Sequence, residues 1–389
     1  MKPRQIKDGI FWLGSLDWDR RLFDALIPLP DGTTYNAYLV QGEDKTVLLD
    51  TVDIPKVPEI LEQLRGVEKI DYVVSHHAEP DHSGGVPAVL ERYSEAMLLC
   101  TEKCKAMLMD RFEIPGERFQ VVADGETLNL GGRTLEFLHM PWVHWPETMV
   151  TWLREDRILF SCDLFGSHIA STDLFVRDEA RVFEAAKRYY AEIMMPFAKL
   201  IAKHLERLAP YDIQLIAPSH GSLYDEPAFI LDAYREWASG KPHNLVVIPY
   251  VSMHGSTRMM VDFLTEELAE RGVGVMRFDL SEVDIGKLAM ALVDAATIVI
   301  ATPTVLTGPH PKALYAAALA NLIRPKAKYA SIIGSYGWGT KVVEQVAAAL
   351  PNLKVEILPP ILGKGIPKKE EKAALSKMAD QIAQRHREL

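Results

Sequence analysis

The segment IDYVVSHHAEPDHSGG, from Ile70 to Gly85, decides the fold of the first half of this chain. It opens as an apolar run that predicts a β-strand ending at Ser75, and its two glycines and the following Pro87 indicate the start of a helix. Between them, three histidines and two carboxylates occupy seven residues. Polar side chains at the carboxyl end of a strand are typical of binding sites in layered α/β proteins.

The pattern H-x-E-x-D-H within this segment offers four side chains that bind metals, His77, Glu79, Asp81 and His82. Side chains two residues apart on an extended turn point the same way, so His77 and Glu79 are expected to bind one ion. Asp81 and His82 are then expected to bind a second ion beside it. A polar turn held by hydrogen bonds is the simpler alternative.

Three further candidate ligands each follow a β-rich run of their own. They are His144 in PWVHWPETM, Asp163 in RILFSCDLFG and His220 in IQLIAPSHGS. Any one alone is more often an ordinary polar residue, but together they complete four histidines and three carboxylates, which suits two ions. Two cations held ~3.5–4 Å apart need an anion between them, and Asp163 is the predicted bridge. The nearby His76 and His168 are expected to have supporting roles.

Composition narrows the class of protein. The 389 residues and 48% hydrophobic content favour two domains with well-buried cores. The net charge of −10, without a dense lysine or arginine run, argues against a nucleic-acid partner. No leader peptide and no long uncharged apolar run stands out, which predicts a cytoplasmic protein that is not inserted in a membrane. The three cysteines are expected to be reduced thiols.

The order of elements changes near residue 242. Residues 1–242 alternate short β-runs with helical patterns, and a long amphipathic stretch from Glu179 to Leu208 predicts one helix or a helical pair. Residues 243–389 alternate five β-runs with helices, which predicts a doubly wound five-stranded parallel sheet. We therefore predict an α/β protein of two domains, 1–242 and 243–389.

Three loops at the ends of β-runs in the second domain are predicted to bind a phosphate and its ligand. The first precedes a helix expected to begin near Ser256, where backbone N–H groups and the helix dipole favour an anion. Because neither a G-x-x-x-x-G-K-[ST] nor a G-x-G-x-x-G motif is present, a monophosphate fits better than a triphosphate or a dinucleotide. The candidate residues are Ser252, Met253, His254, Gly255, Ser256 and Thr257; Pro303, Thr304, Val305, Leu306, Thr307 and Gly308; and Ser335, Tyr336, Gly337, Trp338 and Gly339.

These motifs carry a resemblance to known families. The first domain resembles the metallo-β-lactamase fold, an αββα sandwich whose hydrolytic members show H-x-H-x-D-H and bind zinc. Here Glu79 replaces the second histidine, and its hard oxygen donor favours iron. The second domain resembles flavodoxin, which binds FMN. In their order and spacing, HAEPDH, HWPETM, SCDLFG, PSHG and SMHGST together resemble the flavodiiron proteins, also called A-type flavoproteins.

That resemblance implies a function and further residues. Members reduce dioxygen to water, nitric oxide to nitrous oxide, or both, at two irons supplied with electrons through FMN. It implies one iron on His77, Glu79 and His144, another on Asp81, His82 and His220, and Asp163 between them. Tyr190 matches a tyrosine that lines the substrate pocket in several members, and Asp24 stands where many members have histidine.

The resemblance also implies partners. No C-x-x-C pair follows the second domain, so an external electron donor is expected, such as rubredoxin, a reduced deazaflavin or a reductase. A head-to-tail homodimer, or a dimer of dimers, would bring the FMN of one chain to the irons of the other. Two alternatives remain open: a binuclear metallohydrolase with an FMN regulatory domain, and an electron-transfer flavoprotein with a vestigial metal site.

Overall fold

The computed structural model describes residues 1–23 and 25–389 of the chain, so the candidate Asp24 lies outside the described residues. The chain divides into two compact units. One comprises Met1–Tyr190 and Lys199–Arg235, and the other comprises Ala191–Ala198 and Glu236–Leu389. This division by packing falls inside the helix Ala228–Ala238, and the domain boundary at residue 242 stays a prediction.

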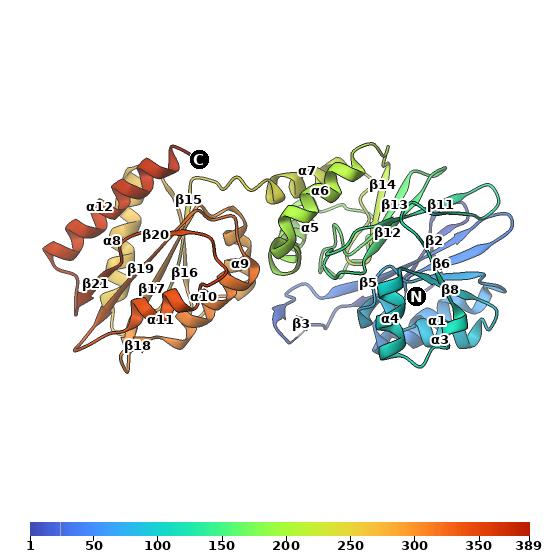
Figure 1. The fold of residues 1–389 in the computed structure, drawn as a ribbon, viewed down its shortest axis with the longest axis horizontal. Helices are drawn as coiled ribbons and strands as arrows, with labels where there is room; N and C mark the ends of the chain where they lie inside the picture. Colours follow the sequence, from blue (N-terminus) through green and yellow to red (C-terminus); the bar gives the residue numbers. More distant parts are fainter. Residues whose placement is uncertain (24) are drawn as a thin grey trace. The chain divides into compact units, whose positions relative to one another are not determined.

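The first unit contains two large sheets and a small hairpin (Figure 1). The larger sheet runs in the order β1 (Arg4–Lys7), β2 (Ile10–Asp17), β5 (Thr33–Gln41), β6 (Thr46–Leu49), β7 (Tyr72–Val74), β8 (Met97–Cys100) and β9 (Phe119–Val121). The other runs in the order β10 (Thr127–Asn129), β11 (Thr134–His139), β12 (Met149–Leu153), β13 (Ile158–Cys162) and β14 (Leu215–Pro218). The hairpin pairs β3 (Leu22–Phe23) with β4 (Ile27–Pro28).

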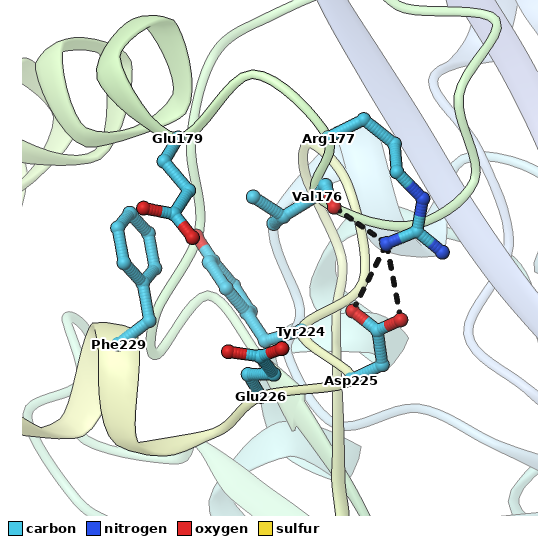
Figure 2. A pocket seen from close by; sticks show the side chains of 7 residues that line it. All are labelled: Val176, Arg177, Glu179, Tyr224, Asp225, Glu226 and Phe229. Carbon is cyan, nitrogen blue, oxygen red and sulfur yellow. Dashed lines mark hydrogen bonds and ion pairs between the residues drawn. The ribbon is translucent and has the colours of Figure 1, made fainter.

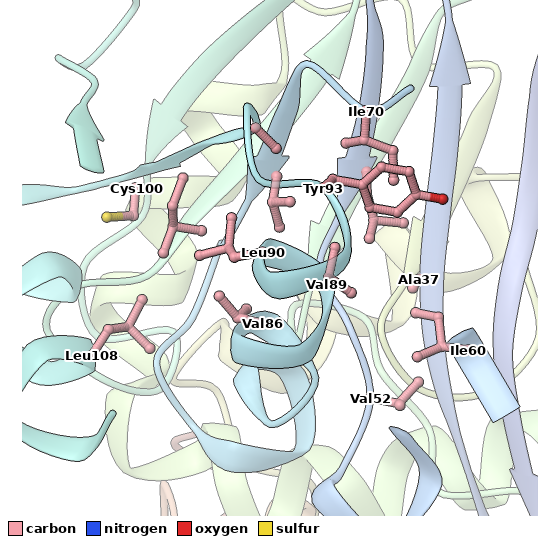
Figure 3. Close-up of a cluster of buried hydrophobic side chains, with 14 of the residues drawn as sticks. Ala37, Val52, Ile60, Ile70, Val86, Val89, Leu90, Tyr93, Cys100 and Leu108 are labelled. Atoms are coloured by element: carbon pink, nitrogen blue, oxygen red, sulfur yellow. The ribbon is translucent and has the colours of Figure 1, made fainter. Parts of the chain in front are cut away.

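Strand alternation builds two cores on the two faces of the larger sheet. Leu48 and its successor Leu49 belong to different clusters of buried residues, because neighbouring side chains of a strand point to opposite faces. On one face, the cluster includes Ile60, Val86 and Leu108 from helices α1, α3 and α4 (Figure 3). On the other, residues of the second sheet complete the core. Full burial of each such aliphatic side chain stabilises the fold by roughly 1.5–3 kcal/mol.

The helices of the first unit follow the predicted pattern with one interruption. The stretch from Glu179 to Leu208 forms a helical pair, α5 and α6, separated by a π-helical turn (Tyr190–Met194) and a short 3₁₀ turn (Met195–Phe197). Pro196 in that turn cannot donate a backbone hydrogen bond, which accounts for the break. The helices are α1 (Val57–Gln63), α2 (Pro80–Ser83), α3 (Val86–Arg92), α4 (Glu102–Arg111), α5 (Glu179–Tyr189), α6 (Ala198–Leu208) and α7 (Ala228–Ala238).

The second unit is a doubly wound sheet whose main strands are parallel, as predicted from the sequence. The strand order is β16 (Gly274–Asp279), β15 (Leu245–Tyr250), β17 (Thr297–Val305), β19 (Tyr329–Tyr336) and β20 (Glu356–Ile357), with β21 (Ile361–Lys364) also on β19 and β18 (Gly308–Pro309) on β17. Helices lie on both faces (Figure 1). They are α8 (Ser256–Glu270), α9 (Ile285–Asp294), α10 (Pro311–Ile323), α11 (Val342–Ala348) and α12 (Lys369–His386).

Within the described residues, no helix is both long enough and apolar enough to cross a membrane.

Candidate metal centre

The seven candidate ligands lie at one end of the sheets of the first unit. His77 and Glu79 follow β7, and Asp81 and His82 lie on the short helix α2. His144 lies between β11 and β12, Asp163 directly follows β13, and His220 lies two residues after the end of β14. Gly84 closes the α2 turn tightly, since a Cβ there would lie 2.5 Å from the Pro80 carbonyl oxygen. The local sequence thus brings all seven side chains to one place.

His77, Glu79 and His144 form what we call the first triad. Oε2 of Glu79 lies 3.1 Å from Nε2 of His77 and 3.1 Å from Nε2 of His144. Both imidazoles therefore turn the same ring nitrogen toward one carboxylate oxygen. The two rings meet edge to face, with centroids 5.2 Å apart.

Asp81, His82 and His220 form the second triad. Oδ2 of Asp81 lies 3.1 Å from Nε2 of His220, and Oδ1 of Asp81 lies 3.4 Å from Nε2 of His82. The carboxylate thus presents one oxygen to each imidazole. All three residues are buried.

Asp163 lies between the two triads. Its Oδ1 is 3.1 Å from Nε2 of His82 and 3.5 Å from Nε2 of His220. Its Oδ2 is 3.5 Å from Nε2 of His77 and 3.6 Å from Nε2 of His144. One oxygen of the carboxylate faces each triad, which is the arrangement that a bridging ligand needs.

The donor set fits two metal ions. In the group of the first triad with Asp163, and in the second triad, all ligand atoms lie within 4.8 Å of one another. Both oxygens of Asp81, Nε2 of His82 and Oδ2 of Asp163 are buried without a hydrogen-bond partner among the described residues. Buried polar atoms are rarely left unsatisfied, so these atoms are placed to bind something other than protein. Imidazole with carboxylate is a donor set that iron accepts.

The electrostatics show how closely the charges are coupled. Burial alone would lower the pKa of His77, yet its hydrogen bonds to Glu147 and Glu79 raise that pKa well above the usual value. Burial likewise opposes protonation of His82, but the charges of Asp163 and Asp81 raise its pKa to about 10. Despite burial, the His82 charge holds the pKa of Asp163 well below its usual range. The buried Asp163 carboxylate and the His82 imidazole thus each favour the charged form of the other.

Sequence reasoning missed the groups that hold these ligands in place through hydrogen bonds. Nδ1 of His77 donates to Oε1 of Glu147 at 2.6 Å, and Nδ1 of His220 donates to the Thr34 carbonyl at 2.6 Å. The Tyr189 hydroxyl donates to Oδ1 of Asp163 at 2.7 Å. A signal for Glu147 was present, because a carboxylate close to a candidate ligand histidine is a common partner of metal-binding imidazoles.

Tyr190, predicted as a catalytic residue, lies beside Tyr189 but is placed differently. It is fully buried, and its ring meets Tyr234 edge to face with centroids 5.3 Å apart. Its assignment stays a prediction, and Tyr189 is the tyrosine whose hydroxyl contacts a candidate ligand.

The two additional histidines have the supporting positions expected of them. Both ring nitrogens of His76 are engaged, Nδ1 with Asp50 at 2.6 Å and Nε2 with Thr151 at 2.7 Å. His168 contacts Thr33 through Nδ1 at 2.9 Å, and its ring packs against that of His220. Neither belongs to a triad.

The three candidate ligand-binding loops of the second unit meet at the carboxyl ends of neighbouring parallel strands. The hydroxyls of Thr257 and Ser335 are 3.0 Å apart, which links the first and third loops. The Thr304 hydroxyl lies 2.9 Å from that of Thr340, which links the second and third. Gly255 has φ +88° and immediately precedes α8, which begins at Ser256 as predicted. The loops thus surround the amino end of α8, where a phosphate is favoured.

The second of these segments differs from the prediction because it is largely strand, and the third begins with the last two residues of a strand. β17 continues to Val305, turns at Leu306 and Thr307 with positive φ angles, and returns as β18 from Gly308. β19 likewise continues to Tyr336. Antiparallel pairing of β17 with β18 satisfies backbone groups that a loop would leave to solvent. Leu306 and Trp338 are highly exposed at the ends of these strands.

The first unit also has a small pocket whose lining residues differ from those of the metal centre. It is lined by Val176, Arg177, Glu179, Tyr224, Asp225, Glu226 and Phe229 (Figure 2). Arg177 pairs with Asp225 at 3.1 Å. None of the seven candidate ligands lines it, and it has no part in the site described above.

This chain is similar to a beta lactamase family model and to several oxidoreductases. The sequence model of the ODP family beta lactamases matches residues 33–221. The nitric oxide reductase of Moorella thermoacetica is 35% identical over 368 residues, covering 92% of each chain. A solved rubredoxin oxygen:oxidoreductase from Desulfovibrio gigas is 32% identical, covers 99% of both chains and has a TM-score of 0.94. A flavodiiron protein from Giardia intestinalis is 27% identical, covers 99% of this chain and 97% of its own, and has a TM-score of 0.93.

Proposed function

Because the chain belongs to the flavodiiron protein family, we propose that it reduces dioxygen to water, nitric oxide to nitrous oxide, or both, with electrons delivered through FMN to two irons. The observation that carries the proposal is Asp163, whose two carboxylate oxygens face separate triads of histidine and carboxylate. This arrangement is matched by a second unit whose strand-end loops suit a flavin phosphate.

The seven ligand-type residues of the first unit are assigned to the irons. The first triad would hold one iron, the second triad would hold the other, and the Asp163 carboxylate would face both. The bound irons would supply one-electron redox chemistry to a small diatomic substrate. The residues would set the charge of the cluster, since three carboxylates and four neutral imidazoles would leave a pair of divalent ions with a net charge of about +1.

Glu79 favours an oxidoreductase over a hydrolase. Its oxygen lies between two imidazole nitrogens of the first triad, in the position where hydrolytic relatives of this fold have a third imidazole. An anionic oxygen ligand stabilises higher oxidation states of a metal better than a neutral nitrogen does. The runner-up, a binuclear metallohydrolase, therefore lacks a supporting observation.

The second unit is assigned to FMN. The first loop, Ser252 to Thr257, offers hydroxyls and backbone N–H groups to the phosphate at the amino end of α8. Gly255 leaves open space, because a Cβ at this position would meet nothing within 4 Å. The exposed Trp338 and the neighbouring Tyr336 would flank the flavin ring. Bound FMN accepts electrons in pairs and releases them singly.

The electron donor and the assembly complete the proposal. The electrons come from a separate donor such as rubredoxin, a reduced deazaflavin or a reductase, in line with relatives named rubredoxin-oxygen oxidoreductase and coenzyme F420H2 oxidase. The working unit is a head-to-tail homodimer, in which each metal centre receives electrons from the FMN of the partner chain.

One experiment tests the proposed activity and separates the two substrates. The iron- and FMN-loaded protein is supplied with one artificial donor, and turnover is measured with dioxygen and, without air, with nitric oxide. Consumption of either gas in proportion to donor electrons is expected. Absence of turnover with both gases, in protein that contains two irons and FMN, would contradict the proposal.

A further inference from the structure

The Glu147 carboxylate lies directly behind a ligand of the first triad. Nδ1 of His77 donates to Oε1 of Glu147 at 2.6 Å, while Nε2 of the same ring faces Glu79 and Asp163. Both side chains are fully buried. The imidazole is therefore held between an outer carboxylate and the metal-binding face.

Among residues 1–23 and 25–389, no equivalent contact to the histidines of the second triad is found. Nδ1 of His220 donates to the backbone carbonyl of Thr34, which is neutral. Apart from the candidate ligands, Asp50 is a carboxylate close to His82, with ligand atoms within 4.8 Å. However, Oδ1 of Asp50 accepts from the backbone N–H of His76, and Oδ2 is engaged by the His76 ring and by Ser219. The two metal positions therefore differ in what supports their imidazole ligands.

Glu147 is itself held rigidly. The backbone N–H of Ala78 donates to Oε1 of Glu147 at 3.0 Å, and the Thr101 hydroxyl donates to the Glu147 carbonyl at 2.9 Å. Oε2 of Glu147 is buried and accepts no hydrogen bond from the described residues. Its negative charge is thus directed at His77 with little competition from other donors. Because Glu147 follows His144 in the same loop, it also ties that loop to the segment that carries His77.

We propose that Glu147 is a positioning residue that makes the first triad the tighter of the two metal subsites, so that this subsite fills first. An anionic partner makes an imidazole a stronger donor to a metal and fixes its ring orientation and tautomer, and it does so more strongly than a neutral carbonyl. The inference rests on the assignment of two metals under the proposed function, and it adds an order of filling that this assignment does not contain.

The experiment titrates metal-free protein with Co²⁺ alone and follows the visible absorption of the bound ion. Wild-type protein is expected to bind two ions in two resolved steps. Two single-site variants assign these steps: His220→Ala should keep the tight step, and His144→Ala should lose it. Placed in the His220→Ala background, Glu147→Gln should weaken binding of the remaining ion by about 10–100-fold.

Two further variants separate charge from loop anchoring. Thr101→Val removes the hydrogen bond to the Glu147 carbonyl but leaves the carboxylate beside His77, so the tight step should change by less than in the glutamine variant. Glu147→Asp keeps the charge but moves it away from His77. Its loss of cobalt affinity in the tight step should lie between those of Thr101→Val and Glu147→Gln. If the glutamine variant does not fold, as judged by circular dichroism, the comparison of Glu147→Asp with Thr101→Val decides.

The outcomes are distinct. The role of Glu147 would be overturned if Glu147→Gln left the cobalt affinity of the tight step unchanged. It would also be overturned if Thr101→Val lowered that affinity by as much as Glu147→Gln. Loss of the tight step in His220→Ala rather than in His144→Ala would show that the second triad fills first. Wild-type protein that binds fewer than two cobalt ions would instead overturn the two-metal assignment of the proposed function, and this inference with it.

Discussion

The Glu79 carboxylate determines which metal the first triad favours. Replacing it by histidine restores the ligand pattern of hydrolytic relatives and removes a negative charge that now lies 3.1 Å from two imidazole nitrogens. We expect Glu79→His to bind a higher proportion of zinc and to reduce dioxygen more slowly than wild type. Elemental analysis after expression with iron and zinc, together with oxygen uptake, measures both effects. Unchanged iron content and turnover would mean that Glu79 is not a ligand.

Tyr189 supports the predicted bridge through its hydroxyl, 2.7 Å from Oδ1 of Asp163. Removing a hydrogen bond to a buried carboxylate costs about 1.5–3 kcal/mol. We expect Tyr189→Phe to lower the free energy of unfolding of the metal-free protein by about this much. Urea unfolding measures this change, and gas reduction by the reloaded protein shows the effect on activity.

Tyr190→Phe is the matched variant, since it removes the neighbouring hydroxyl. It tests the sequence-based assignment of Tyr190 to the substrate pocket. If Tyr190→Phe impairs turnover more than Tyr189→Phe does, the contact with Asp163 is the less important of the two.

At single residues, the sequence pointed to side chains that the structure brings together, although their role as ligands stays a prediction, and it did not point to the groups that contact them. The seven ligand-type side chains could be found because each follows a β-rich run, and strand ends converge at one edge of a sheet. Glu147 and Tyr189 could not be assigned in the same way. Their contacts depend on the path of the loop from His144 and on the rotation of α5, neither of which residue spacing specifies.

The turn before α8 depends on Gly255, whose φ of +88° is unfavourable for residues with a side chain. A Cβ would meet no neighbour, so the cost of Gly255→Ala is backbone strain of about 1 kcal/mol. We expect FMN affinity to fall by roughly five-fold, as 1 kcal/mol implies. FMN fluorescence quenching measures this change. Gly272→Ala is the control, since Gly272 also has a positive φ and open space around its Cβ but lies outside the three loops. An equal loss of FMN affinity in both variants would exclude strain in the loop before α8 as the cause.

The terminal helix α12 is joined to the sheet by His386. Its ring nitrogens contact Thr297 at 2.7 Å and Asn244 at 2.9 Å, and burial lowers its pKa from 6.5 to about 4. As the pH falls below 6.5, the unfolded chain binds the proton first. The contribution of neutral His386 to the free energy of unfolding is therefore fully present above pH 6.5. It is lost progressively as the pH falls to about 4, and the total loss is about 3 kcal/mol.

Urea unfolding at pH 7 and pH 5 tests this effect. We expect His386→Gln to show a smaller loss of stability between the two pH values than wild type. His243→Gln changes a half-exposed histidine of the same unit and should retain the wild-type loss. Equal pH dependence in wild type and His386→Gln would contradict the role of His386.

Among the elements, alternating strands were predicted well and their ends were not. The β-runs of both units reappear as strands because side-chain alternation and apolar runs reflect burial directly. The extension of β17 into a hairpin was missed, because the positive φ angles at Leu306 and Thr307 are not typical of these residue types. The stretch from Glu179 to Leu208 left one helix or two open, and the turn at Pro196 divides it.

At the scale of the whole molecule, the proposed homodimer predicts that electrons pass from the FMN of one chain to the metal centre of the other. One variant lacks the bridge through Asp163→Ala, and the other has a disrupted Ser252–Thr257 loop. Each is expected to be inactive alone, and mixed dimers should regain activity, since one pairing joins an intact FMN site to an intact metal centre. Gas uptake after subunit exchange measures the recovery. No recovery despite proven exchange would mean that electrons pass within one chain.

The central claim is that electrons from the flavin are used at the metal centre of the first unit. The most direct test compares oxygen uptake by the same FMN-loaded protein carrying either iron or zinc, with one artificial donor. Zinc occupies N/O ligands but undergoes no redox change. The account predicts that the iron form consumes one dioxygen for every four donor electrons, while the zinc form falls to the slow reaction of flavin with oxygen. Equal uptake by the two forms would contradict it.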